Sequence, residues 1–116
     1  MNERRLTSAK KVSTPALRDR RRKIIRRVPD LEQVLRGSLM KRYLTCGKPG
    51  CKCSRGERHG PVWYLSVTLR AGKTVGMQVP EEKVQGIRLL LENYRKVKES
   101  LEAACEINWE LLRRQR

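Results

Sequence analysis

Three cysteines and the only histidine of the chain lie close together near its middle. Cys46, Cys51 and Cys53 form a C-x4-C-x-C pattern, and His59 follows Cys53 by six residues. Zinc is typically bound by four thiolate or imidazole ligands in a tetrahedron, and the glycines and prolines of this segment allow a short loop to wrap around an ion. We therefore predict one structural Zn²⁺ held by these four side chains.

The same segment carries four basic side chains, which would help to keep the thiolates deprotonated. They are Lys48, Lys52, Arg55 and Arg58. Two alternatives stay open. The cysteines could instead be reduced structural or redox-active thiols, because the C-x-C spacing forces two thiolates close together on one ion. Cys105 could replace His59 as the fourth ligand, although its place on an apolar helical stripe favours packing in the core.

Positive charge is concentrated in the first half of the 116-residue chain. Lys and Arg number 28 against 12 Asp and Glu, for a formal net charge of +16. Residues 1–30 hold a net charge of +8 and residues 31–61 hold +5, whereas residues 81–116 hold only +1. Concentrated positive charge is typical of a surface that binds a polyanion, and nucleic acid is the commonest polyanion in a cell. An anionic membrane surface and an acidic protein partner are the alternatives.

Three segments supply candidate contacts to nucleic acid, with DNA favoured over RNA. An arginine-rich helix would lie along phosphates or in a groove, the cysteine loop would hold further basic side chains, and the polar face of a hairpin would enter a major groove. The candidates are Arg18, Arg20, Arg21, Arg22, Lys23, Arg26 and Arg27 on the helix, Lys48, Lys52, Arg55 and Arg58 in the loop, and Tyr64, Arg70 and Lys73 on the hairpin. The simpler alternatives are a solvated helix face and the wet side of an ordinary antiparallel sheet.

Cap and turn signals place the helices of the first third. Residues 1–13 are polar and lack periodicity, which indicates a flexible basic arm. Thr14 and Pro15 have the form of an N-cap and a first helical position, and they predict a helix over residues 15–27. Pro29 ends it, and a short second helix is expected before Gly37. The apolar side chains expected to face the core are Leu17, Ile24, Ile25, Val28, Leu31, Val34 and Leu35.

Alternating apolar and polar residues predict a β-hairpin over residues 62–69 and 75–79, joined by a turn at Gly72. Residues 38–45 are predicted as a further strand, and residues 46–61 as a segment without regular structure. A long helix is expected to begin at Glu81, to run to about Arg113 and to cover the hairpin. The side chains expected to be buried are Trp63, Leu65, Val67, Leu69, Val75, Met77 and Val79 on the hairpin, and Val84, Ile87, Leu91, Tyr94, Leu101 and Cys105 on the helix.

These elements predict an α+β fold, in which an antiparallel hairpin, extended to three strands by residues 38–45, packs on the long C-terminal helix. We divide the chain into a flexible basic arm over residues 1–13, a basic helical segment over residues 14–36 and a small metal-pinned domain over residues 37–116.

The motif residues together resemble a family of short, basic, uncharacterised bacterial and archaeal proteins. The resemblance is carried by the run CGKPGCKC from Cys46, by the run HGPVWYLS from His59, and by shorter matches before and after them. It covers roughly residues 37–112, so the arm and the first helix would be additions particular to this chain. The resemblance implies a small domain of unknown activity, with some members linked to transposon-type genes.

An enzyme is not expected. Hydrolytic chemistry usually needs a carboxylate cluster or a positioned general base, whereas seven of the 12 acidic residues fall in residues 81–116 as surface partners. The sequence has no apolar run long enough to span a membrane and no secretory signal, which favours a cytoplasmic protein. The leading hypothesis is a zinc-stabilised nucleic-acid-binding protein that serves a mobile element. The alternative is a protein-interaction or oligomerisation module that uses the C-terminal helix.

Overall fold

The computed structural model describes residues 9–44 and 59–115. The described elements are α2 (Thr14–Arg27), the 3₁₀-helix η1 (Leu31–Gln33), the strands β1 (Gly37–Leu44), β2 (His59–Arg70) and β3 (Lys73–Val79), the 3₁₀-helix η3 (Glu81–Lys83) and α3 (Val84–Arg114). The chain forms two compact units, one of residues 1–32 and 93–116 and the other of residues 33–92. The α+β class and the three-stranded sheet are confirmed. One boundary between the two units lies between residues 32 and 33, before β1, and the other lies inside α3, between residues 92 and 93.

The unit of residues 33–92 is an antiparallel sheet with the strand order β1-β2-β3. Gly72 connects β2 to β3 with a φ of 79°, a left-handed conformation that glycine adopts without steric cost. Leu65 and Val67 of β2 and Val79 of β3 are buried together with Val84, the first residue of α3. Since a two-stranded hairpin is marginal in water, this contact with the helix supplies the burial that the sheet needs.

The helix covers only part of the apolar sheet face. Leu69, Val75 and Met77 are 57%, 44% and 56% exposed, although each was expected to be buried by its place in the alternation. A shift in the pairing between Thr68 and Arg70 lies at one end of this region. The reason for the difference is geometric, because one helix is too narrow to cover three strands and β3 extends beyond it.

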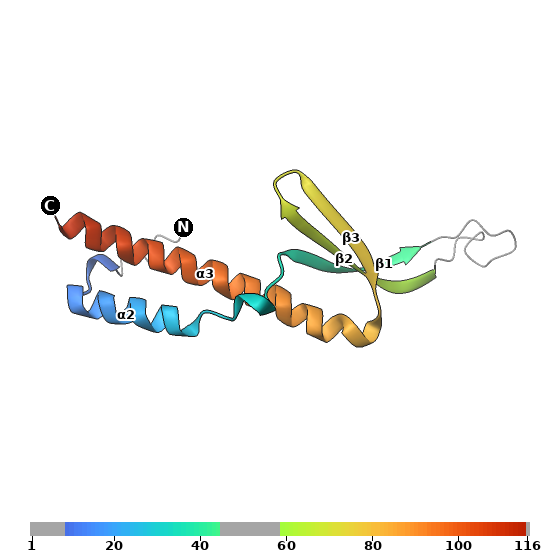
Figure 1. Cartoon of the computed structure of the whole chain (residues 1–116), viewed down its shortest axis with the longest axis horizontal. Coiled ribbons are helices and arrows are strands. Elements are labelled where there is room, and N and C mark those ends of the chain that lie inside the picture. Colours follow the sequence, from blue (N-terminus) through green and yellow to red (C-terminus); the bar gives the residue numbers. More distant parts are fainter. Residues whose placement is uncertain (1–8, 45–58, 116) are drawn as a thin grey trace, which may run out of the picture. The chain divides into compact units, whose positions relative to one another are not determined.

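The second unit pairs α2 with the C-terminal part of α3, and the two helices lie side by side (Figure 1). Ser13 caps α2, since its hydroxyl accepts a hydrogen bond from the backbone N–H of Ala16 over 3.4 Å, so the cap lies one residue before the predicted Thr14. Leu17 is fully buried and packs with Ile107 and Leu111. Ile25, Val28 and Leu31, which were also expected to face the core, are exposed.

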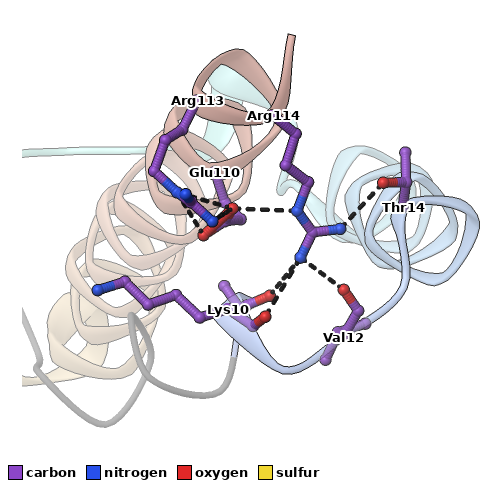
Figure 2. Close-up of polar contacts among 7 residues, drawn as sticks. Lys10, Val12, Thr14, Glu110, Arg113 and Arg114 are labelled. Carbon is purple, nitrogen blue, oxygen red and sulfur yellow. Dashed lines mark hydrogen bonds and ion pairs between the residues drawn. The ribbon is translucent and has the colours of Figure 1, made fainter. Parts of the chain in front are cut away.

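Arg114 ties the chain before α2 to the end of α3 (Figure 2). Its guanidinium donates hydrogen bonds to the backbone carbonyls of Ala9 and Val12, over 3.2 and 2.7 Å, and to the Thr14 hydroxyl over 2.9 Å. Ala9 is itself buried against Leu17. The prediction of a flexible arm over residues 1–13 is therefore wrong for residues 9–13, which the structure fixes against α3.

Glu110 lies beside this guanidinium and is 2% exposed. Its carboxylate accepts hydrogen bonds from Arg113, at 2.7 Å, and from Arg114, at 3.0 Å (Figure 2). The hydrogen bonds from Arg113 hold the pKa of Glu110 below its ordinary value, against the opposing effect of burial, and Arg114 lowers it further. A residue that reads as polar surface in the sequence is thus buried because two arginines neutralise it.

A pH dependence of stability follows from the lowered pKa of Glu110. Because folding favours the charged carboxylate, the stabilisation is present above the pKa of an unfolded glutamate, about 4.3, and is lost as the pH falls below it. As the pH is lowered from 6 to 2.5, the free energy of unfolding should decrease less in Glu110→Gln than in the wild type. Urea unfolding at several pH values would measure this decrease. Glu102→Gln, at an exposed position of α3, should keep the wild-type slope; equal slopes in all three proteins would contradict the assignment.

A second apolar stripe on α3 faces solvent. Leu101, Trp109 and Leu112 are 62%, 57% and 61% exposed, and Cys105 between them is exposed with a free thiol. We call these four residues the α3 stripe. The prediction that Leu101 and Cys105 pack in the core is wrong, because this part of α3 buries the opposite face, which includes Ile107 and Leu111. Among the described residues, no helix combines the length and the apolar character needed to cross a membrane.

Candidate nucleic-acid interface

The basic side chains of α2 are mostly without partners. Lys23 forms an ion pair with Asp19 over 3.2 Å, and Arg21 donates a hydrogen bond to Asn108 over 2.8 Å. Within the described part of the chain, the remaining basic residues of this helix have no hydrogen bond or ion pair. They are Arg18, Arg20, Arg22, Arg26 and Arg27, and all five are exposed. Asp19 is the only acidic residue of the helix, so its positive charge is largely uncompensated.

A cavity of about 570 Å³ lies between α2 and the end of α3. We call it the α2–α3 cavity. The described residues that line it are Thr14, Arg18, Arg21, Asn108, Leu111, Leu112, Arg114 and Gln115. Three of these residues carry a guanidinium and none carries a carboxylate. Because Arg114 is paired with Glu110, the positive charge of the cavity comes from Arg18 and Arg21.

The Tyr64 ring is covered on the sheet. The Arg42 guanidinium lies over the ring, with its Cζ atom 4.0 Å from the ring centroid. On β3, a Cβ atom at Gly76 would come within 2.6 Å of the Tyr64 Cζ atom, so only glycine leaves room for the ring. The ring therefore packs between a guanidinium and the backbone, and its faces are not free to stack on a base.

Arg70 and Lys73 occupy paired positions where β2 turns into β3, and both are exposed. They stand at the tip of the hairpin, and their contact with phosphates stays a prediction. Trp63, next to Tyr64 on β2, lies under two cations, with Lys41 Nζ 5.1 Å and Arg88 Cζ 5.0 Å from its ring centroid. These stacked cations keep the indole from contributing to an exposed aromatic surface.

The predicted zinc loop lies outside the described residues. Cys46, Cys51 and Cys53 fall there, together with Lys48, Lys52, Arg55 and Arg58, whereas His59 begins β2. The prediction that residues 46–61 lack regular structure is thus wrong for residues 59–61. In the part of the chain that the structure describes, no three His, Cys, Asp or Glu side chains gather into a group able to hold a metal ion.

Comparison with protein families gives one match. The model of a family described as Domain of unknown function (DUF6788) matches residues 14–89. The chain belongs to this family. The DUF6788 match begins at the first residue of α2, so the expectation that the first helix is an addition particular to this chain is wrong. Comparisons with curated proteins and with solved structures found no match.

The DUF6788 segment contains α2 and the whole sheet but ends at residue 89, inside α3. Asn108 and Arg114, which complete the lining of the α2–α3 cavity, lie beyond it. Sequence reasoning missed both residues, as it missed the stacked Arg42. The one signal for Asn108 was its interruption of an apolar helix, and no local pattern connects it to Arg21, which lies 87 residues away.

Proposed function

We propose that the chain binds nucleic acid, with α2 contacting the phosphate backbone. The observation that carries the proposal is a set of five exposed arginines on this one helix of 14 residues, none of which has a partner among the described residues. Arg113 and Arg114 of α3 differ from these five, because both are paired with Glu110. Unpaired guanidiniums repel one another, and phosphates relieve that repulsion while releasing condensed counterions.

The structure favours contacts to the phosphate backbone of nucleic acid over recognition of single-stranded bases. Such recognition usually depends on several exposed aromatic faces gathered on one surface. On the sheet, the Tyr64 ring and the Trp63 ring both carry stacked cations, and the exposed rings of Tyr43 and Trp109 belong to different units. Duplex DNA is the favoured partner, because the major groove of B-form DNA admits an α-helix and the major groove of A-form RNA does not.

A salt titration tests this function. Binding of the full chain to a fluorescent DNA duplex should weaken steeply with salt, and five phosphate contacts would give a slope of about −4.5 for log K against log salt. The same titration with duplex RNA and single-stranded DNA would show whether duplex DNA is preferred. The absence of binding at low salt, or an affinity that does not change with salt, would exclude the proposal.

We also propose that the segment between β1 and β2 holds a structural Zn²⁺ through Cys46, Cys51, Cys53 and His59. The strand register supports this, because Leu44 pairs with His59 and so brings the start and the end of the segment together. Elemental analysis of the purified chain should give about one zinc per chain. Cys51→Ser should lose it, whereas Cys105→Ser should retain it. A metal-free, folded wild type would contradict the site, and a loss of zinc in Cys105→Ser would make Cys105 the fourth ligand.

The α3 stripe favours a second candidate function, the pairing of two copies of the chain through α3. Leu101, Cys105 and Trp109 are spaced by four residues and Leu112 follows by three, so that all four fall on one side of the helix, as in the seam between paired helices. Light scattering at increasing concentration would show a dimer, which Leu112→Asp should convert to a monomer. A mass that stays monomeric in the wild type would exclude pairing.

A further inference from the structure

We propose that the α2–α3 cavity binds one phosphate group of the nucleic-acid backbone, an inference that rests on the proposed function and assigns it a specific subsite. Exposed arginines elsewhere on α2 offer only charge on an open surface. The cavity differs because it brings side chains from two helices around one space of about 570 Å³. A phosphate that enters it meets hydrogen-bond donors from both α2 and α3.

The positive charge available to a ligand comes from Arg18 and Arg21. Arg18 has no hydrogen bond or ion pair within the described part of the chain, so its guanidinium is not neutralised. Arg21 uses one nitrogen, Nη1, in its bond to Asn108 and keeps its other N–H groups for a ligand. Arg114 also lines the cavity, but it is committed to Glu110, Thr14 and backbone carbonyls and acts as part of the wall.

Asn108 supplies a neutral donor. Since Arg21 can only donate, the Asn108 atom that it contacts is the amide oxygen, and the amide NH₂ group is left without a partner among the described residues. An oriented amide beside two guanidiniums is a common way of holding a phosphate oxygen. The Arg21–Asn108 bond thus fixes the donor group before any ligand binds.

The groove on the other side of α2 provides a contrast. It has a volume of about 440 Å³ and is lined by Arg27 and Lys96, but also by the Glu99 carboxylate. Glu99 forms an ion pair with Arg95. A carboxylate in the lining repels an anion, so of these two spaces it is the α2–α3 cavity whose described lining leaves the positive charge unopposed.

A titration of the full chain with inorganic phosphate at constant ionic strength tests the subsite. The NMR signal of the Asn108 side-chain amide monitors the titration. We expect a saturable shift, and Arg18→Gln should weaken phosphate binding about tenfold, as expected for loss of a charged hydrogen bond. Arg22→Gln is the matched control, because Arg22 is an exposed, unpartnered arginine of the same helix outside the cavity. Addition of duplex DNA should then shift the same amide and compete with phosphate.

The outcomes separate the subsite from the proposed function. A missing phosphate shift, or an equal loss of phosphate binding in Arg18→Gln and Arg22→Gln, would overturn the subsite. Salt-dependent binding of DNA that does not change the NMR shift of the Asn108 amide would also overturn the subsite. The function proposed for α2 would then stand. Phosphate binding in the cavity without any binding of DNA would instead reject the nucleic-acid function and, with it, the assignment of the site to backbone phosphates.

Discussion

Leu17→Ala is expected to lower the free energy of unfolding by about 2–5 kcal/mol, the cost of removing a buried leucine and leaving a cavity. Leu17 is 0% exposed and is the largest fully buried side chain among the residues that the structure describes. The core around it is small, with Ala9, Ile107 and Leu111 as its other buried members. So few side chains cannot close over the space left by the missing atoms, which places the effect toward the upper part of that range.

Ile25→Ala is the control for this substitution. Ile25 stands on the same helix and is 64% exposed, so its truncation should change the free energy of unfolding by less than about 0.5 kcal/mol. Chemical denaturation followed by circular dichroism would measure both proteins. Equal losses of stability would mean that helix propensity, rather than packing on α3, dominates at these positions.

Replacing Arg20, Arg22 and Arg26 by glutamine should weaken binding to duplex DNA about 100-fold near 0.1 M salt and reduce the salt slope by about 2.7, the values for three lost phosphate contacts. All three are exposed and unpartnered within the described residues and lie outside the α2–α3 cavity, so the fold and the subsite should be retained. The measurement is fluorescence anisotropy of a labelled duplex at several salt concentrations, with circular dichroism to verify folding.

A matched variant separates local contacts from overall charge. Lys83, Lys96 and Lys98 are exposed on η3 and α3. Replacing them by glutamine also removes three positive charges, but from outside α2. We expect this variant to lose only a few-fold in affinity and to keep most of the salt slope. If the two triple variants lost the same affinity, binding would depend on net charge alone and α2 would not be the interface.

The parts of the fold that were predictable are those controlled by neighbouring residues. The alternation over residues 62–69, the turn at Gly72 and the stop at Pro29 depend on local sterics and hydrogen bonding, and the structure has the strands and the helix end where these signals place them. Period-two alternation identifies the apolar face of a sheet but carries no information on the width of the element that covers it. Val75 and Met77 were therefore expected to be buried and are exposed.

The buried face of α3 near its end was not predictable for a related reason. Glu106 and Glu110 are 3% and 2% exposed, yet each reads as a surface residue on a helix of balanced charge. Burial of Glu110 requires Arg113 and Arg114, and the position of Arg114 depends in turn on carbonyls near the other end of the chain. Such long-range compensation leaves no periodic signal, so the apolar stripe through Leu101 and Cys105 appeared to be the core.

The candidate site likewise has one part that the sequence predicted and one part that it did not. The positive charge of α2 is a property of composition and was apparent from the sequence. The cavity that brings two of its arginines to one space is a property of packing, because it needs Asn108 from a helix far along the chain. Tyr64 is a residue that the sequence suggested as a contact and that the structure makes unsuitable for stacking. Arg42 and the backbone at Gly76 cover its ring, and no local pattern indicates either contact.

The pairing of α2 with the end of α3 has a consequence for how the chain is made. Residues 33–92 form a contiguous unit, whereas Thr14 cannot bind Arg114 until that residue, 100 positions later, has been synthesised. Leu17 likewise has no core until Ile107 and Leu111 emerge. The most basic helix is thus synthesised well before the part of α3 on which it packs, and in the interval its arginines and its apolar side chains are exposed together.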